Sequence, residues 1–145
     1  MPDYVIPSGR ILTTGDFLDV AVRRAMSSGI VAIAEGASID SVYHALVSHR
    51  IHAVLVVGAK SATPLGWATA SGLLAHADED RSLVSARDAI TEEPHEIGMQ
   101  ETVRDAITML SEMNTTHLIV VEQRGGFPVG VISELDVAAF LGRSN

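Results

Sequence analysis

The sequence contains no cysteine, a single lysine at Lys60 and few aromatic residues. Without cysteine the chain cannot hold a disulfide framework, a thiolate metal site or a cysteine nucleophile, and it suits a reducing cytoplasm. Basic residues are also scarce, because 10 lysines and arginines stand against 18 acidic residues, for a formal net charge of -8. A general nucleic-acid binder needs basic residues that neutralise phosphates, so that class is not expected. The charge does not exclude one small bound nucleotide.

Long apolar runs and a leader pattern are missing as well. The start, Met1 to Tyr4, shows no basic stretch followed by an apolar one, so no secretory signal is visible. The longest apolar runs, such as Ala53 to Val57 and Leu118 to Val121, fall far short of the roughly 20 residues that span a bilayer. We therefore expect a cytoplasmic protein that does not insert into membranes.

The sequence does contain aliphatic residues for one sizeable core. Hydrophobic residues make up 47% of the 145 positions and aromatic residues only 4%, so valine, isoleucine, leucine and alanine must fill the interior. Apolar residues at helical spacing, each set behind a residue that can cap a helix, predict helices that begin after Thr14, Ser38, Thr69, Thr102 and Ser133. Short apolar runs predict strands at 30–34, 53–57, 65–68, 95–98, 117–121 and 127–132.

The chain also repeats itself. An offset of 64 residues, without a gap, joins matched glycines, prolines and core residues: Gly66 and Gly130, Pro64 and Pro128, Val56 and Val120, Leu46 and Leu110. Such a match indicates a duplicated unit with the order strand, helix, strand, strand, helix. We expect a mixed α+β fold in which two β-α-β-β-α units pack about a pseudo-twofold axis, with an N-terminal arm and helix. The expected boundaries are 1–15 for the arm, which is irregular to about residue 13, 16–77 for the first repeat and 78–145 for the second.

The motifs inside the repeats resemble those of a known family. The first copy enters with Val22 to Met26 and ends in Gly66 to Thr69. The second contains Gly130 to Asp136, which fits the pattern of glycine, two apolar residues, serine or threonine, two variable residues and aspartate. From about residue 16 to 142 the chain resembles a pair of cystathionine-β-synthase (CBS) domains, also called a Bateman module, here expected to stand alone. Each motif by itself is weak, whereas the duplicated set in order is specific.

This resemblance implies that clefts between the repeats bind an adenosyl ligand such as AMP, ADP, ATP or S-adenosylmethionine. By position, Asp136 is then the ribose ligand and Ser133 its hydroxyl companion. A carboxylate can accept hydrogen bonds from both ribose hydroxyls, and charge-assisted bonds are the stronger ones. Thr116 and His117 stand where the family places a basic residue that meets phosphate.

The walls of the adenine site follow from the same resemblance. Ile97 and the backbone near Thr91 and His95 are expected to hold the base. The first repeat departs from the pattern, because Thr69 keeps the hydroxyl but Gly72 stands where the second copy has Asp136. With His52 in the phosphate position, this first-repeat site is expected to be degraded. Histidine is only partly charged near neutral pH, which favours AMP or an adenosyl compound with little negative charge.

The expected function is therefore a regulatory sensor, with the adenosyl ligand as effector, no obligatory cofactor and no catalytic residues. A homodimer is implied, and a regulated enzyme or transporter is a candidate partner. The alternative is a ligand-free interaction or scaffolding module. Ser133 with Asp136 also has the form of a capping box, which stabilises a helix without any ligand.

Metal and enzyme hypotheses find less support. His44, His49 and His52 lie close in sequence, but the first two are five residues apart on a predicted helix and no carboxylate falls at a matching spacing. Surface histidines are the simpler interpretation, and no metal site is predicted. Glu92, Glu93 and Glu96 lack a nucleophile or base in a definable arrangement, so an enzyme is not expected.

Overall fold

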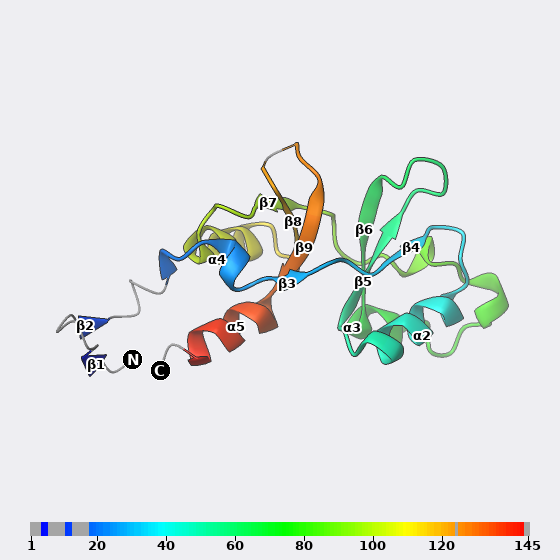
Figure 1. Cartoon of the computed structure of the whole chain (residues 1–145). Helices are drawn as coiled ribbons and strands as arrows, with labels where there is room; N and C mark the ends of the chain where they lie inside the picture. The colour runs from blue at the N-terminus through cyan, green and yellow to red at the C-terminus, as the bar shows by residue number, and fades with distance from the viewer. Residues whose placement is uncertain (1–3, 6–10, 13–17, 124, 144–145) are drawn as a thin grey trace. The chain divides into compact units, whose positions relative to one another are not determined.

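The computed structural model describes residues 4–5, 11–12, 18–123 and 125–143. The chain divides into two compact units, which we call unit 1 (residues 1–29 and 95–145) and unit 2 (residues 30–94). Each unit combines a sheet with helices, which confirms the expected α+β class (Figure 1).

Unit 2 contains a three-stranded sheet of order β4-β5-β6. Its elements in chain order are β4 (Ala32–Ala34), α2 (Ile39–His49), β5 (Ala53–Val57), β6 (Pro64–Thr69), α3 (Ala70–Leu73), and the 3-10 turns η2 (Leu74–His76), η3 (Arg81–Leu83) and η4 (Arg87–Ala89). β4 and β5 are parallel, which needs the crossover through α2, whereas β5 and β6 are antiparallel neighbours joined by a hairpin.

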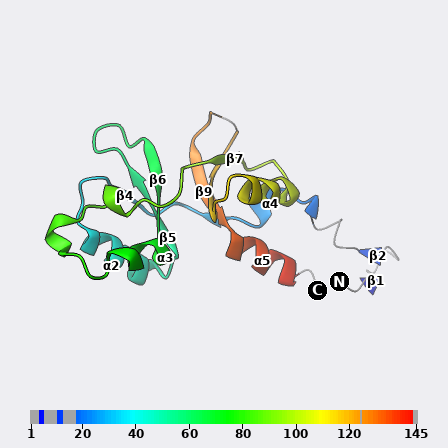
Figure 2. The ribbon, with the colours of Figure 1, turned by 180° about the vertical axis from the view of Figure 1, so that it is seen from behind.

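Unit 1 contains a four-stranded sheet of order β3-β9-β8-β7 and, near the start of the chain, a two-stranded ribbon. Its elements are β1 (Tyr4–Val5), β2 (Ile11–Leu12), η1 (Val22–Arg24), β3 (Ser27–Ser28), β7 (Glu96–Gly98), α4 (Val103–Glu112), β8 (His117–Val121), β9 (Pro128–Ser133) and α5 (Glu134–Arg143). β7 and β8 are parallel and β8 and β9 antiparallel, as in unit 2. Figure 2 shows α4 and α5 on this unit from behind.

Each unit is completed by a segment that precedes the other unit's strands in sequence. We call residues 18–29 and 84–92 the exchanged segments. In unit 1 the first segment donates from the backbone N–H groups of Val22 and Arg23 to the carbonyls of Glu101 (2.6 Å) and Met99 (3.0 Å). The second segment makes the corresponding bonds in unit 2. The N–H groups of Ala86 and Arg87, 64 positions after Val22 and Arg23, donate to the carbonyls of Ala37 (2.8 Å) and Glu35 (3.1 Å). The compact units thus divide the chain differently from the predicted repeats 16–77 and 78–145, whose boundaries remain a prediction.

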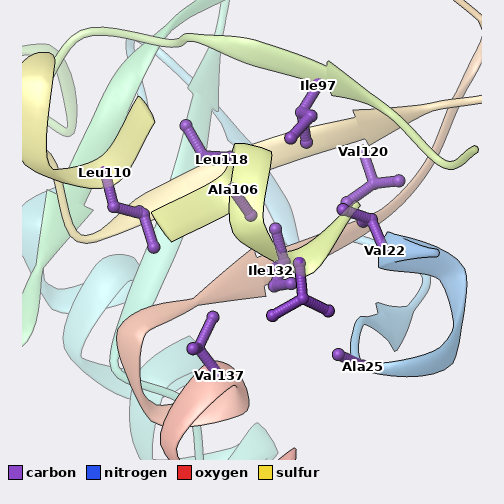
Figure 3. Close-up of a cluster of buried hydrophobic side chains, with 10 residues drawn as sticks. Val22, Ala25, Ile97, Ala106, Leu110, Leu118, Val120, Ile132 and Val137 are labelled. Carbon is purple, nitrogen blue, oxygen red and sulfur yellow. The ribbon is translucent and has the colours of Figure 1, made fainter. Parts of the chain in front are cut away.

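Both units bury an aliphatic core. In unit 1 it lies between the sheet and the two helices, where side chains from η1, β7, α4, β8, β9 and α5 converge (Figure 3). Val22 brings the exchanged segment into this cluster and is fully buried. The core of unit 2 is built in the same way around Val42, Val54 and Leu73, with Ala86 and Ala89 from its exchanged segment.

Most of the expected elements are present. The strands at 53–57 and 117–121 have the predicted bounds. The capping hydroxyls of Ser38, Thr69 and Thr102 each accept a hydrogen bond from the backbone N–H three residues later, which confirms these helix starts.

The N-terminal part differs from the expectation. Residues 14–17, where a helix was expected to begin, lie outside the described residues, and residues 22–24 form only a 3-10 turn. A longer helix is prevented because the N–H groups of Val22 and Arg23 bond to the segment 99–101 instead. The expected irregular arm includes the antiparallel pair β1 and β2, whose apolar residues favour strands.

Candidate functional site

The junction between β9 and α5 is closed by a reciprocal pair of side chains. The Oδ2 atom of Asp136 accepts hydrogen bonds from the backbone N–H (2.9 Å) and the hydroxyl (3.0 Å) of Ser133. In return, the backbone N–H of Asp136 donates to Ser133 Oγ at 3.1 Å. This is a capping box with aspartate in place of glutamate, and it satisfies N–H groups that the start of a helix leaves without partners.

A second hydroxyl reaches the same carboxylate. Ser27, on β3 of the exchanged segment, donates from Oγ to Asp136 Oδ1 at 3.2 Å. β3 pairs antiparallel with β9, and Ser27 lies opposite Val131. Ser27 is exposed and Asp136 half-buried, so the Oδ1 side of the carboxylate faces a group that another hydroxyl can replace. The junction therefore presents one anionic acceptor with two hydroxyls around it.

Thr116 and His117 lie at the same end of the sheet. The Thr116 carbonyl accepts from the backbone N–H of Glu134 at 3.0 Å, which ties the start of β8 to the start of α5. His117 pairs with Ser133 across β8 and β9, and its Nδ1 atom is 2.8 Å from the Thr116 hydroxyl. Four of the predicted site residues, Ser133, Asp136, Thr116 and His117, are thus brought together within unit 1.

The three residues predicted to hold adenine have contacts of their own within their units. Ile97 is fully buried in the core of unit 1. The carbonyl of His95 accepts from the backbone N–H of Ile119 at 2.9 Å, so this backbone belongs to the pairing between β7 and β8. Thr91 lies in unit 2, where its hydroxyl is 3.0 Å from the hydroxyl of Thr69. Their role at an adenine site remains a prediction.

The corresponding junction of unit 2, between β6 and α3, has the same plan with fewer polar groups. Thr69 Oγ1 accepts from the backbone N–H of Gly72 at 3.1 Å, as Ser133 does from Asp136. The His52 carbonyl accepts from the N–H of Ala70 at 2.8 Å, as the Thr116 carbonyl does from Glu134. With Gly72 in the position of Asp136, this junction lacks the carboxylate.

Sequence reasoning missed Ser27. A signal was available, because Ser27 and Thr91 are related by the same offset of 64 residues as Gly72 and Asp136. The offset identifies residues at corresponding positions of the two copies. It does not say that the leading segment of the first copy packs on the helix junction of the second copy within unit 1, and this exchange is what brings Ser27 to Asp136.

Three carboxyl groups with lowered pKa values lie in turns of unit 2. The backbone N–H of Ala59 and then the Arg87 guanidinium hold the pKa of Glu35 below its ordinary value of 4.5. The hydroxyl and backbone N–H of Ser82 lower the pKa of Asp80, and the backbone N–H and hydroxyl of Ser85 lower the pKa of Asp88. These local bonds stabilise turns. A hollow of about 560 Å³ beside Asp80 and Asp88 includes none of the predicted site residues.

Two kinds of feature are absent from the described part of the chain. Among residues 4–5, 11–12, 18–123 and 125–143, no helix has the length and apolar character that crossing a membrane requires. Within the same ranges, no three histidine or acidic side chains gather as a metal site would require.

Comparison with known proteins places this geometry in a family. The CBS domain model matches residues 22–79 and 86–143, two segments that are again 64 positions apart. No curated protein matches the sequence. Among solved structures, the CBS domain of a bacterial CNNM/CorC family Mg2+ transporter in complex with ATP is similar, with a TM-score of 0.72, 22% identity, and coverage of 88% of this chain and 90% of that chain.

Two other solved structures share the fold. A CBS domain of a bacterial CNNM/CorC family Mg2+ transporter in complex with an inhibitor has a TM-score of 0.73 and 24% identity, covering 87% of this chain and 78% of that chain. The CBS domain of a membrane protein from Sphaerobacter thermophilus has a TM-score of 0.69 and 17% identity, covering 88% and 91%. With both family matches and the shared fold, the chain belongs to the CBS domain family and contains two CBS domains.

Proposed function

We propose that the chain is a regulatory module that binds an adenosyl compound at the β9–α5 junction of unit 1. The observation that carries this proposal is the half-buried carboxylate of Asp136, whose Oδ1 atom accepts a hydrogen bond from the exposed hydroxyl of Ser27. A similar CBS domain, from a Mg2+ transporter, has been solved in complex with ATP. The module acts by binding rather than by catalysis.

The chemistry of the junction suits a ribose. Vicinal hydroxyls of a ribose can replace the Ser27 hydroxyl at Asp136 and form charge-assisted bonds, which are stronger than bonds between neutral groups. Phosphate would lie near the start of α5, where backbone N–H groups favour an anion. Glu134 and Asp136 already place two acidic residues in that first turn. Among AMP, ADP, ATP and S-adenosylmethionine, we therefore favour AMP or a compound with little negative charge.

Binding at Asp136 has a direct route to a conformational response. A ligand that displaces the Ser27 hydroxyl loosens the bond between α5 and the exchanged segment that carries β3. Any resulting shift is limited by the ligand's difference in affinity between the two states. The signal passes to a partner, for which a regulated enzyme or transporter is our candidate.

Calorimetric titration with AMP, ATP and S-adenosylmethionine tests the proposal. We expect AMP to bind the wild type in the micromolar to low millimolar range and Asp136→Ala to bind roughly 10- to 100-fold more weakly, since hydrogen bonds to a charged group contribute about 1.5–3 kcal/mol. Asp105→Ala is the matched control. Asp105 forms the same kind of capping box with Thr102 on α4, so this variant loses a cap and keeps the affinity for AMP.

Two results would contradict the proposal in different ways. If none of the three compounds binds the wild type, the sensor function is wrong and the ligand-free interaction module takes its place. If Asp136→Ala binds AMP as well as the wild type does, the site is wrong even though the function stands.

We also propose that the chain forms a homodimer through its helices. Both units leave apolar side chains exposed on or next to helices, with Val47 and Leu74 in unit 2 and Leu135 in unit 1. Exposed apolar side chains mark an interaction surface where they form a contiguous patch, and we propose that these do so at the dimer interface. Sedimentation velocity decides the point, and a monomer at micromolar concentration would refute it.

A further inference from the structure

We propose that the γ-methyl group of Thr91 takes the place of the missing carboxylate in unit 2 and keeps that junction closed. This inference extends the proposed function, because it explains why one unit is open to a ribose and the other is not. It concerns a side chain that belongs to the exchanged segment and not to the motif that ends in Gly72.

The space beside Gly72 carries the argument. A Cβ atom added at Gly72 would lie 2.3 Å from Thr91 Cγ2, 2.9 Å from Thr91 Oγ1 and 3.0 Å from Thr69 Oγ1. Real Cβ atoms do not approach a carbon at 2.3 Å, so any larger residue at this position requires Thr91 to move. The glycine therefore marks a filled position and not simply a lost carboxylate.

Thr91 is held where it is by its own hydroxyl. Its Oγ1 atom lies 3.0 Å from Thr69 Oγ1, the atom that also caps α3 through the N–H of Gly72. Because threonine is branched at Cβ, few χ1 rotamers are open to it, and a rotation that withdraws the methyl also moves the hydroxyl. Thr69 is only 6% exposed, so loss of this bond would leave a buried hydroxyl with one partner fewer.

Unit 1 shows the same arrangement without the methyl. Ser27 stands 64 positions before Thr91, and Asp136 stands 64 positions after Gly72. The serine donates its hydroxyl to the carboxylate at 3.2 Å, and the absent γ-methyl leaves room for the acid. The space beside the helix start is thus occupied in two alternative ways. In unit 1 it holds the Asp136 carboxylate next to Ser27, and in unit 2 it holds the Thr91 methyl group next to Gly72.

Thermal unfolding of the full chain tests this without any ligand. In an uncrowded helix Gly→Ala raises stability, because alanine is the better helix former. We expect Gly72→Ala instead to lower the melting temperature by about 2–6 °C, as an overpacked site does. Gly142→Ala on α5 is the control, since a Cβ there meets nothing within 4 Å, and it should raise the melting temperature.

The second variant assigns the crowding to the methyl. In a Thr91→Ser background, Gly72→Ala should lower the melting temperature much less than it does in the wild type, or should raise it. If Gly72→Ala raises the melting temperature of the wild type as Gly142→Ala does, or if its cost is the same in both backgrounds, the inference is wrong.

A binding experiment with AMP makes the reciprocal change. Ser27→Thr adds the methyl beside Asp136 and should weaken AMP binding roughly tenfold or more. Ser28→Thr adds the same group one residue along β3 and should leave the affinity unchanged. Unchanged binding by Ser27→Thr would overturn the inference. If the wild type binds no AMP, the proposed function fails, and the unfolding experiment still decides the role of Thr91.

Discussion

The two strand-to-helix junctions start alike and then diverge. Ser133 and Thr69 accept a hydrogen bond from the N–H three residues later at the same distance of 3.1 Å. After that, α5 continues for 10 residues, whereas α3 ends after 4 and passes into a 3-10 turn. The shared hydroxyl is therefore part of the architecture of both junctions. The carboxylate of Asp136 is particular to unit 1, so a ligand function must rest on it and not on Ser133.

The divergence extends into the strands. Trp67 on β6 and Val131 on β9 occupy matched positions, opposite Leu55 and Ile119 respectively. Trp67 is 1% exposed and is among the largest fully buried side chains, while Val131 is only half-buried. At this position unit 2 thus buries a large aromatic side chain, where unit 1 has a smaller and more exposed one.

The largest effect that sharpens this comparison is expected at Trp67. Trp67→Ala should lower the free energy of unfolding by about 3–5 kcal/mol, because a fully buried aromatic side chain leaves a cavity. Val131→Ala should lower it by only about 1 kcal/mol. Urea unfolding followed by circular dichroism measures both. Equal costs would mean that the two positions are packed alike and that the contrast between the units is smaller than argued.

A smaller loss of stability is expected when a side chain is added at the glycine that contacts each exchanged segment. A Cβ at Gly130 would lie 2.3 Å from the Ser27 carbonyl oxygen, and one at Gly66 would lie 2.4 Å from Ile90 Cγ2 and 2.6 Å from the Glu92 carbonyl oxygen. Gly130→Ala and Gly66→Ala should each lower the free energy of unfolding by about 1–3 kcal/mol.

Gly36→Ala serves as the control for this pair, because a Cβ there meets nothing within 4 Å. The substitutions at the two crowded glycines test a feature that the units share, the close packing of each exchanged segment against a strand. A cost in only one of them would show that just one unit depends on close packing of its exchanged segment.

Much of this architecture can be predicted from the sequence because it depends on local signals. The strands 53–57 and 117–121 are uninterrupted aliphatic runs, and the capping residues Ser38, Thr69 and Thr102 announce the helices behind them. The offset of 64 residues then ties the copies together. At the site, Ser133 and Asp136 follow from one motif, since two residues three positions apart at a helix start lie close together.

What the sequence did not reveal depends on contacts between distant segments. Ser27 bonds to a residue 109 positions away, and no local pattern announces that pairing. The helix expected to begin after Thr14 does not continue through residues 19–24 for the same reason, because the N–H groups of Val22 and Arg23 are taken by residues 99–101. Periodicity describes a segment by itself and cannot indicate which other segment satisfies its backbone.

The smallest expected effect concerns a salt bridge of unit 2. Unit 1 lacks the acidic residue that the corresponding salt bridge would need. Arg87 Nη1 lies 2.7 Å from Glu35 Oε1, whereas the residue 64 positions after Glu35 is Met99, which carries no charge. The pKa of Glu35 is lowered, first by the N–H of Ala59 and then by Arg87. A carboxyl group with a lowered pKa stabilises the fold above its unfolded pKa, here 4.5, and the contribution disappears as the pH falls through the folded value.

Glu35→Gln should therefore unfold slightly more easily than the wild type at neutral pH, and the difference in free energy of unfolding should narrow as the pH falls below 4.5. The effect is small because the Arg87 side chain is 65% exposed and solvent screens the pair. Fluorescence of Trp67, the single tryptophan, reports on unit 2 during urea unfolding. A gap that persists unchanged at low pH would mean that the ionised carboxylate is not its source. The charge would then be no part of what separates unit 2 from unit 1.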